Sequence, residues 1–494
     1  MEQQSSKMRE MEEPLILQEQ PQTPLIKQVL LESSKIWQIA GPAIFSRVAL
    51  FSMTLISQAF AGHLSNLDLA AISIATTVII TISFGSLLGM ASALETLCGQ
   101  AYGAKQYHMM GIYLQRSWIV LFICAVMLLP MYLFASSILR VTGQLEEVAE
   151  KAAGVVALWL IPLHFSFAFQ FPLQRFLQCQ IKTAVIAWVA GGAFVVHVIL
   201  SWFFVYKVQV GLVGTAIILD FSWWLSVFGL FGYTVWGGCE DSWRGFSSLA
   251  FCGLWEFFKL SAASGVMLCL ENWYYRILII VSGSLSSSEV ALDALSIWVR
   301  VANELGAGNR KAAKFSSIVS VVTSLLVGFI FWCAILIFRN QIAQIFTSSL
   351  PVISYVSQLS VLLAFTIILS SIQPVLSGVA VGSGWQSLVA YINIGCYYVI
   401  GVPLGVLLGW VFQFGIKGIW AGMISGTVVQ TLILVFITVK FDWGKEQQQI
   451  QIYSQATDTS RISSRLSLII SRYTYYEYLE AIKLVFSESL YATH

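Results

Sequence analysis

The chain has 494 residues, of which 57% are hydrophobic and only 11% are charged, and its formal net charge is +2. One soluble core of this size does not bury so much apolar surface, and the apolar residues come in runs of about twenty, the length that crosses a bilayer as a helix. The near-neutral charge gives no basis for nucleic-acid binding, and the eight scattered cysteines form no Cys-x-x-Cys motif or Cys/His cluster. The composition therefore predicts an all-α polytopic membrane protein without a metal site.

Residues 1–35 are polar and mixed in charge, and they lack the basic start and small-residue cleavage site of a signal peptide. We expect them to form a disordered cytoplasmic tail. Eleven apolar runs follow, each long enough to span a bilayer as a helix. They cover residues 36–61, 69–93, 112–137, 152–176, 183–206, 211–236, 256–282, 315–338, 351–378, 384–411 and 416–440.

Loop-like residues divide these runs into two groups. The predicted domains are an N-terminal lobe of six spans at residues 36–236, a cytoplasmic linker at 237–255 and a C-terminal lobe at 256–443. Residues 444–494 are expected to form a cytoplasmic tail.

An internal repeat relates the two groups. The Gly-x-x-Gly of "GLVGTA", starting at Gly211, recurs 204 residues later in "GIKGIWA", starting at Gly415. Pro172 in "FPLQ" and Pro374 in "IQPV" are 202 residues apart, and "LAAISI" resembles "LDALSI". The matches keep the same order in both halves, which predicts two pseudo-symmetric six-helix lobes of the kind found in secondary transporters.

The repeat shows that the second lobe is short of one helix. Ile74 and Glu95 of the first lobe are 21 residues apart, whereas the matching Ile297 and Glu304 are 7 residues apart. The only apolar stretch here, at about 290–301, would rise about 18 Å as a helix against a hydrocarbon core of about 30 Å. We therefore predict a truncated second helix in the second lobe.

The basic residues support this interpretation. They fall in alternate loops, which the positive-inside rule assigns to the cytoplasm together with the N-terminus. The cluster Arg300, Arg310, Lys311 and Lys314 belongs on that side only if the chain crosses the membrane between Ser282 and Arg300.

Several stretches between Leu31 and Trp443 resemble the plant branch of the multidrug and toxic compound extrusion (MATE) family, the DETOXIFICATION proteins. They include "SQAFAGHL", "GMASALETLCGQAYGAKQYHMMGIYLQRSW", "CLENWYYRIL", "VRVANELGAGN" and "QPVLSGVAVGSGWQ". The resemblance implies twelve helices in two lobes around a central cleft, export of organic compounds in exchange for H⁺ or Na⁺, mainly H⁺ in plants, and a coupling glutamate in the seventh helix.

The chain departs from the family in three places. The family has roughly twenty further residues after Ile297, enough to complete a spanning helix. The sequence from Lys445 onward is unlike the usual short terminus. Ser370 and Ser371 stand where many plant members carry an acidic residue in the tenth helix, so a paired-carboxylate coupling site is not expected.

Ionisable residues inside a span are functional candidates because they are costly there. Glu271 lies in the middle of "MLCLENWYYRIL", with Tyr274 and Tyr275 on the same helical face. A carboxyl group beside aromatic rings suits a proton or an organic cation; the alternative is a structural carboxylate bonded to neighbouring helices. Asp220 and Asp293 are further candidates for proton coupling or substrate binding, and packing explains Asp220 equally well.

Other residues were assigned supporting roles. Gln373, Trp385 and Gln386 flank a glycine-rich turn and are expected to line the cleft with the two tyrosines. Pro42 and Pro374 are expected to bend their helices, which a rocking transporter can use. Arg47, in the first span, is expected to pair with an acidic neighbour.

The sequence thus predicts a monomeric proton-driven antiporter in the vacuolar or plasma membrane, exporting xenobiotics or alkaloid- or flavonoid-like metabolites. Its partners would be lipid, H⁺ and the small organic substrate. The alternative is a truncated isoform that does not transport, or a faulty gene model of such a transporter. We do not expect an enzyme or a bound cofactor, because no nucleophile–base set, metal-ligand cluster or cofactor motif is present.

Overall fold

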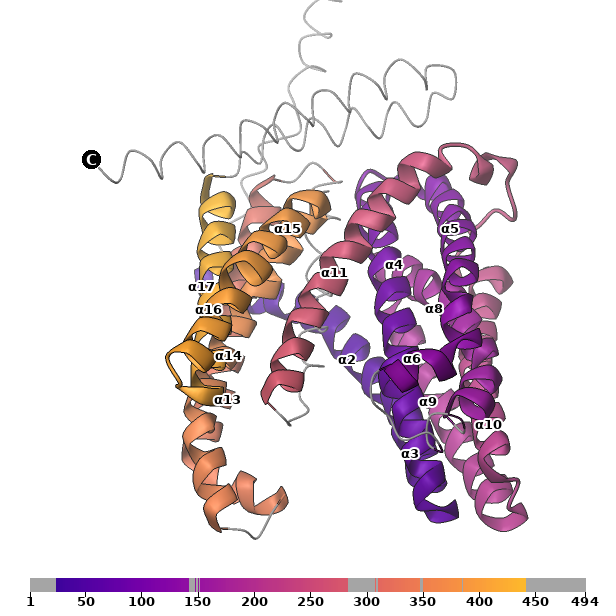
Figure 1. Ribbon diagram of the computed structural model, residues 1–494. Helices are drawn as coiled ribbons and strands as arrows, with labels where there is room; N and C mark the ends of the chain where they lie inside the picture. Colours follow the sequence, from indigo (N-terminus) through magenta and orange to yellow (C-terminus); the bar gives the residue numbers. More distant parts are fainter. Residues whose placement is uncertain are drawn as a thin grey trace, which may run out of the picture.

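The computed structural model describes residues 24–141, 147, 150, 152–282, 307, 310–346, 350–383 and 385–440. The described chain is helical and forms two bundles, with α2–α10 in one and α13–α17 in the other (Figure 1). Helix α11 runs obliquely between them. The predicted all-α membrane fold with two lobes is therefore confirmed.

The first lobe contains six long helical segments, some of which continue through a π-helical stretch. Their bounds are α2 Leu25–Leu64; α3 Asn66–Ile74, η1 Ala75–Ile80 and α4 Thr81–Gly103; α5 Tyr107–Leu133 with the short α6 Ala135–Val141; η2 Ala152–Ala157 and α8 Ile161–Cys179; α9 Thr183–Leu200 and η3 Ser201–Val208; α10 Gly211–Tyr233 and η4 Thr234–Gly238.

The second lobe follows a short 3₁₀ turn, η5 Ser248–Phe251. Its helices are α11 Leu254–Ser282; α13 Arg310–Phe346; α14 Leu350–Gly382; α15 Gln386–Asn393, η7 Ile394–Gly401, α16 Val402–Val406 and η8 Leu407–Val411 in one run; and α17 Gly415–Lys440. In the described part of the chain, nine helices are long and apolar enough to cross a membrane. Of the eleven predicted spans, α8 and α11 fall outside this group, and both carry ionisable residues within the helix.

The N-terminal boundary was predicted wrongly for part of the tail. Helix α2 begins at Leu25, so the last eleven residues of the expected tail at 1–35 are helical. Hydropathy marks where the apolar run begins, whereas the helix extends back through good helix formers. Glu32 is buried there and pairs with Lys35 one turn later, at 3.5 Å.

The repeat is visible in the backbone. Gln209 and Gly211 lie between α9–η3 and α10 with φ values of 59° and 72°, and Gln413 and Gly415 lie between η8 and α17 with φ values of 56° and 58°. A non-glycine residue with positive φ is uncommon. The same left-handed pair, 204 residues apart, therefore reports the same connection in each lobe.

The directions of the helices agree with the predicted extra crossing. Helix α11 runs antiparallel to α4, because Gly265 meets Gly89 whereas the later Cys269 meets the earlier Ser86. Helix α14 ends beside the end of α4 and forms an antiparallel hairpin with α13, in which Gly328 faces Ser371.

Helices α11 and α13 consequently run in the same direction. Ser282, at the end of α11, and Arg310, at the start of α13, therefore lie at opposite ends of the lobe. The predicted truncated helix at 290–301 lies between them, outside the described residues, as does the tail at 444–494.

The two lobes meet mainly where α4 packs against α11, with smaller contacts of α11 with α5, of α14 with α4 and of α13 with α2. At the centre of the main contact, a Cβ atom on Gly89 would lie 2.9 Å from Cα of Gly265. Small residues allow membrane helices to approach closely enough for their backbones to touch. The absence of a side chain at Gly89 therefore sets the distance between the lobes.

We predict that Gly89→Ala lowers the thermal stability of the detergent-solubilised protein, because overpacking typically costs about 1–3 kcal/mol. The matched control is Gly85→Ala, one turn earlier in α4, where a Cβ atom has no neighbour within 4 Å. That change should leave stability unchanged or raise it, since alanine is the better helix former. Equal melting temperatures of the two variants would contradict the close crossing.

Candidate functional site

Glu271 lies in α11 on the inner side of the second lobe, and its side chain is partly exposed. The amide of Gln373 in α14 forms a side-chain hydrogen bond with its carboxyl group. Gln373 is fully buried, and its Nε2 also donates to Ser377 Oγ at 3.1 Å. The structure thus brings together the two residues that the sequence placed on different helices of one cleft.

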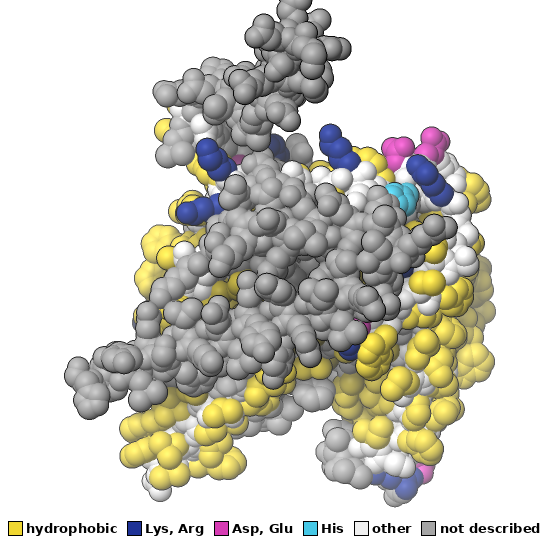
Figure 2. Space-filling model, turned by 90° about the horizontal axis from the view of Figure 1, so that it is seen from above, with side chains coloured by type: hydrophobic (Ala, Val, Ile, Leu, Met, Phe, Trp, Pro, Cys, Tyr) yellow, Lys and Arg dark blue, Asp and Glu magenta, His cyan; other side chains and the backbone are white. Residues whose placement is uncertain are grey.

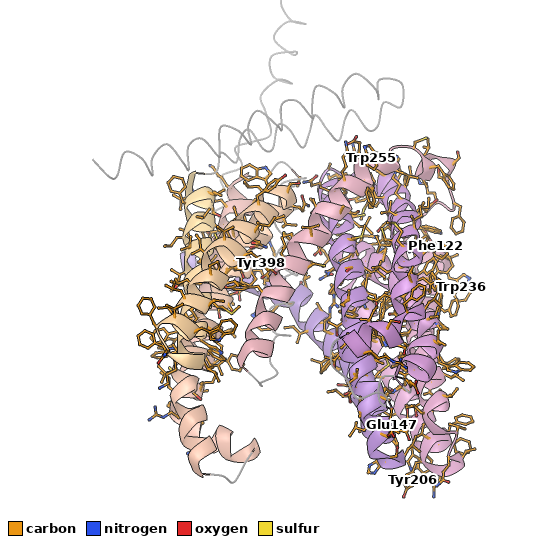
Figure 3. The ribbon with its side chains drawn as sticks, in the orientation of Figure 1. Phe122, Glu147, Tyr206, Trp236, Trp255 and Tyr398 are labelled. Carbon is orange, nitrogen blue, oxygen red and sulfur yellow. The ribbon has the colours of Figure 1, made fainter. Side chains whose placement is uncertain are left out.

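Aromatic rings pack on the same helix, one turn beyond Glu271. The ring of Tyr274 stacks on that of Tyr397 with 4.0 Å between centroids, and its hydroxyl donates to the carbonyl of Met423. Tyr398, labelled in Figure 3 on the second lobe, donates from its hydroxyl to the carbonyl of Leu270 at 2.9 Å. These bonds connect α11 to the π-helical η7 and to α17.

The expectation that Tyr274 lines an open cleft was wrong. Its side chain is 1% exposed and occupies a space left by two glycines, because a Cβ atom on Gly401 or Gly426 would collide with its hydroxyl. Helical spacing from Glu271 placed Tyr274 on the correct face, but that face is covered by η7 and α17.

A chain of buried side chains closes this network. The hydroxyl of Tyr397 donates to Gln430 Oε1, and Gln430 Nε2 donates to Asn393 Oδ1. Asn393 Nδ2 then donates to the carbonyl of Met267 at 3.3 Å, one turn before Glu271. Within one turn on either side of Glu271, hydrogen bonds therefore connect α11 to α15–η7 and to α17. Glu271 thus lies between residues that connect α11 to α15, η7 and α17.

Asp220 belongs to a different cluster in the first lobe. It is buried in α10, beside the backbone of Leu163 and the hydroxyl of Tyr132. Tyr132 and Ser83 share a hydrogen bond of 2.6 Å, and the ring of His164 lies 4.7 Å from that of Tyr132. Asp220 and Glu271 thus lie in separate lobes, each within its own polar surroundings.

Gln386 was expected to line the cleft but instead joins the lobes. It is fully buried, and its Nε2 donates to Thr96 Oγ1 of α4 at 3.0 Å. Thr96 donates in turn to the carbonyl of Val381 at 3.1 Å, and Gln100 donates to that of Gly382 at 3.2 Å. The glycine-rich turn therefore docks on the end of α4 and closes the contact between the lobes at the predicted cytoplasmic side.

The remaining predicted residues have mixed outcomes. Trp385 precedes α15 and is partly buried against the second-lobe core. Pro42 and Pro374 lie inside α2 and α14, which continue through them. Asp293 and the side chain of Tyr275 lie outside the described residues.

The sequence interpretation missed an ion pair in the first lobe. Arg175 Nη1 lies 3.0 Å from Glu95 Oε2, and both side chains are almost completely buried. Arg47 adds a favourable charge interaction with Glu95, which is thus its expected acidic neighbour. Arg175 lies inside α8. The signal was present, because Arg175 is an ionisable residue within the predicted span 152–176.

Among the described residues, no group of three or more His, Cys, Asp or Glu side chains is arranged to hold a metal ion. The chemistry available at Glu271 is therefore that of a carboxyl group, a neutral amide and aromatic rings. Such a set can bind and release a proton, or attract an organic cation through charge and cation–π contacts.

Two repeated lobes of membrane-length helices, each with a carboxyl group in its interior, define a secondary transporter of the inverted- or parallel-repeat type. The family model described as MatE matches residues 42–203 and 294–407. The chain belongs to this family of multidrug and toxic compound extrusion transporters, and it is accordingly a membrane transporter and not an enzyme.

Known relatives support this assignment over most of the chain. Protein DETOXIFICATION 27 of Arabidopsis thaliana is 59% identical over 441 residues, covering 85% of this chain and 90% of the relative. Protein DETOXIFICATION 26 of the same plant is 55% identical over 446 residues, covering 86% and 91%. The crystal structure of the eukaryotic MATE transporter AtDTX14 superposes with a TM-score of 0.79 at 32% identity, covering 86% of this chain and 99% of that one.

The alignment with DETOXIFICATION 27 also bears on the shortened helix. The alignment is 441 positions long, but it covers 85% of this chain, which is about 420 of its 494 residues. The difference is about twenty positions at which the relative has a residue and this chain has none, enough for most of a spanning helix. This number supports the shortfall predicted from the internal repeat.

We predict that Arg175→Met strongly destabilises the protein, because removing one partner of a buried ion pair costs about 3–5 kcal/mol. The matched control is Arg140→Met, which breaks a pair with Glu150 of 2.8 Å whose side chains are 48% and 61% exposed. Exposed pairs contribute about 0–1 kcal/mol. Thermal unfolding in detergent measures both effects.

If Arg175→Met gives no folded protein, the double variant Glu95→Gln, Arg175→Met should recover it, because neither charge then remains unpaired. Similar losses for Arg175→Met and Arg140→Met would contradict the structural importance of the buried pair.

Proposed function

We propose that this transporter exchanges protons for organic cations and exports them from the cytosol, acting as a monomer in the vacuolar or plasma membrane. The observation that carries the proposal is the position of Glu271: a carboxyl group inside the second lobe whose described partner is a neutral amide. A carboxyl group without a permanent cationic partner can gain or lose a proton without leaving another charge unpaired.

The amide of Gln373 suits both protonation states of Glu271. Its Nε2 can donate to the ionised carboxylate, and its buried Oε1 has no hydrogen-bond partner among the described residues. That oxygen can accept the proton of the neutral acid after a small rotation. The site therefore remains hydrogen-bonded whether Glu271 is charged or neutral.

The substrate class follows from the same surroundings. An aromatic cation gains from the carboxylate charge and from the partly exposed ring of Tyr398, and it competes with the proton because both need the same negative charge. If the cation binds to one conformation of the transporter and the proton to the other, alternation between the two conformations exchanges the cation for the proton. Alkaloid-like and xenobiotic cations fit this chemistry better than anionic metabolites do.

We predict that Glu271→Gln abolishes uptake driven by a pH gradient, because the amide carries neither the proton nor the negative charge. The measurement uses proteoliposomes with an acidic interior and a fluorescent alkaloid cation such as berberine. Uptake by the unmodified protein should collapse when a protonophore is added. The matched control is Glu256→Gln in the same helix, whose exposed side chain pairs with Lys259, and its uptake should equal that of the unmodified protein.

Each other outcome has a defined meaning. Uptake by the unmodified protein that persists without the pH gradient would refute proton coupling. Full uptake by Glu271→Gln would remove the proposed site. Folded protein without any uptake would favour the alternative of a chain that does not transport.

A further inference from the structure

The linker between the lobes, Gly237–Gly253, packs along α5 on the outer side of the first lobe (Figure 1). Gln115 holds it at two points: its Nε2 donates to the carbonyl of Gly245 at 3.0 Å, and its Oε1 accepts from the backbone N–H of Ser247 at 2.8 Å. Arg116 donates from Nη2 to the carbonyl of Leu249 at 3.2 Å. Two neighbouring side chains of one helix thus bind the irregular backbone of the linker.

The position along α5 places these contacts at membrane depth. Gln115 Nε2 also donates to the carbonyl of Gly111, and a Cβ atom on Gly111 would collide with the carbonyl of Ser242 in the linker. The linker backbone therefore meets α5 at the level of Gly111, four residues beyond Tyr107, which corresponds to a rise of about 6 Å. The whole helix rises about 40 Å, so it exceeds the hydrocarbon core by only about 5 Å at each end. The linker therefore descends to the boundary between lipid headgroups and hydrocarbon. Irregular backbone at this depth requires hydrogen bonds from the protein, and Gln115 and Arg116 supply them.

The inner face of the linker packs into the lobe. Ser242 and Ala250 are buried, and the ring of Trp243 lies 5.8 Å from that of Trp118 in α5. Ser242 also donates to Gln180 Oε1 at the end of α8, at 2.8 Å. The linker is thus a folded part of the lobe surface with a defined inner and outer side.

The outer face of the linker and the preceding residue, Trp236, carry large aromatic side chains that are mostly exposed, although the ring of Phe246 also lies 5.4 Å from that of Trp243. Trp236 is 88% exposed, Phe246 77% and Phe251 70%. Trp236 points outward on the same side of the lobe as Phe122, an exposed residue in the middle of α5 (Figure 3). Exposed aromatic side chains of η4 and of α5 therefore lie on the same side of the lobe.

Charged side chains of both signs accompany these rings, because Glu240 and Asp241 are exposed in the linker and Lys259 pairs with Glu256. Arg244 is exposed, and Lys259 lies 5.5 Å from the ring centre of the exposed Trp255. Seen from the predicted cytoplasmic side, hydrophobic side chains cover the edge of this lobe next to a few charged ones (Figure 2). Aromatic rings with lysine or arginine nearby are typical of the headgroup layer, where the rings insert and the charges reach the phosphates.

We propose that the linker Gly237–Gly253 is anchored in the headgroup layer of the cytoplasmic leaflet, with phospholipid as its partner. The linker leads directly into α11, which carries Glu271. Lipid anchorage holds the start of α11 against the first lobe at the membrane surface. Movement of the second lobe then occurs relative to a fixed point at Leu254.

Cys252 provides a direct test, because it is the only exposed cysteine of the eight in the chain. A nitroxide is attached to Cys252 after Cys269 and Cys333, the two partly exposed thiols, are replaced by alanine. Its collisions with oxygen and with a water-soluble nickel chelate are measured in phosphatidylcholine proteoliposomes. The matched control carries the label at Lys105→Cys, with Cys252→Ser, on the exposed turn between α4 and α5.

We expect the ratio of oxygen to nickel collisions to be several-fold higher at Cys252 than at the control position. Gln115→Leu should lower the ratio at Cys252 toward the control value, because the linker loses two of its hydrogen bonds to α5. Equal ratios at both positions in the unmodified linker would place it in water and overturn the proposal. A ratio unaffected by Gln115→Leu would overturn the part of the proposal that assigns Gln115 to holding the linker at this depth.

Discussion

The close crossing of α4 and α11 is the contact on which the arrangement of the two lobes depends. Gly89 and Gly265 bring the two backbones together, and a polar or apolar side chain at either point would separate the lobes. Glu95 follows Gly89 by six residues, and Glu271 follows Gly265 by six. Because the helices are antiparallel, the two glutamates lie on opposite sides of the crossing, each about 9 Å from it along its own helix. Each helix thus carries one carboxyl group away from the shared point, buried in Glu95 and partly exposed in Glu271.

The two carboxyl groups differ in how their charge is balanced. Glu95 is paired with Arg175 and has a second arginine, Arg47, nearby, so its negative charge is compensated permanently. Glu271 has Gln373 as its described partner, and its charge is free to change with protonation. The first arrangement stabilises a fixed structure, and the second suits an exchange of proton and cation.

The hydrogen bonds around these groups assign the two sides of the crossing to different tasks. On the side of Glu95, Thr96 and Gln100 bind the end of α14 and Gln386, which closes the lobes against each other. On the side of Glu271, the contacts lie within the second lobe: the ring of Tyr274 stacks on that of Tyr397, and the hydroxyl of Tyr397 donates to Gln430. The polar contacts near Glu271 therefore lie within one lobe, whereas those near Glu95 join the two lobes.

Sequence reasoning predicted the spans well because a bilayer imposes length and hydropathy on each helix separately. The repeat was also predictable, since Gly211 and Gly415 are required by a left-handed connection that recurs in both lobes. The neighbours of a side chain depend instead on tertiary packing.

Tyr274 and Gln386 were therefore placed on a cleft although other helices cover them. The pairing of Glu95 with Arg175 joins residues 80 positions apart, and no local pattern indicates it. The linker was predicted as a loop from its composition, and its depth became evident only from its bonds to Gln115.

The most direct test of the central claim, that a proton and an organic cation compete for Glu271, is a measurement of proton release. The detergent-solubilised protein is kept in a weakly buffered solution with a pH indicator, and berberine is added. The account predicts that cation binding releases protons from the unmodified protein and from Glu256→Gln, but not from Glu271→Gln. The account would be contradicted if berberine bound to the unmodified protein without releasing protons throughout the range from about pH 5 to about pH 8.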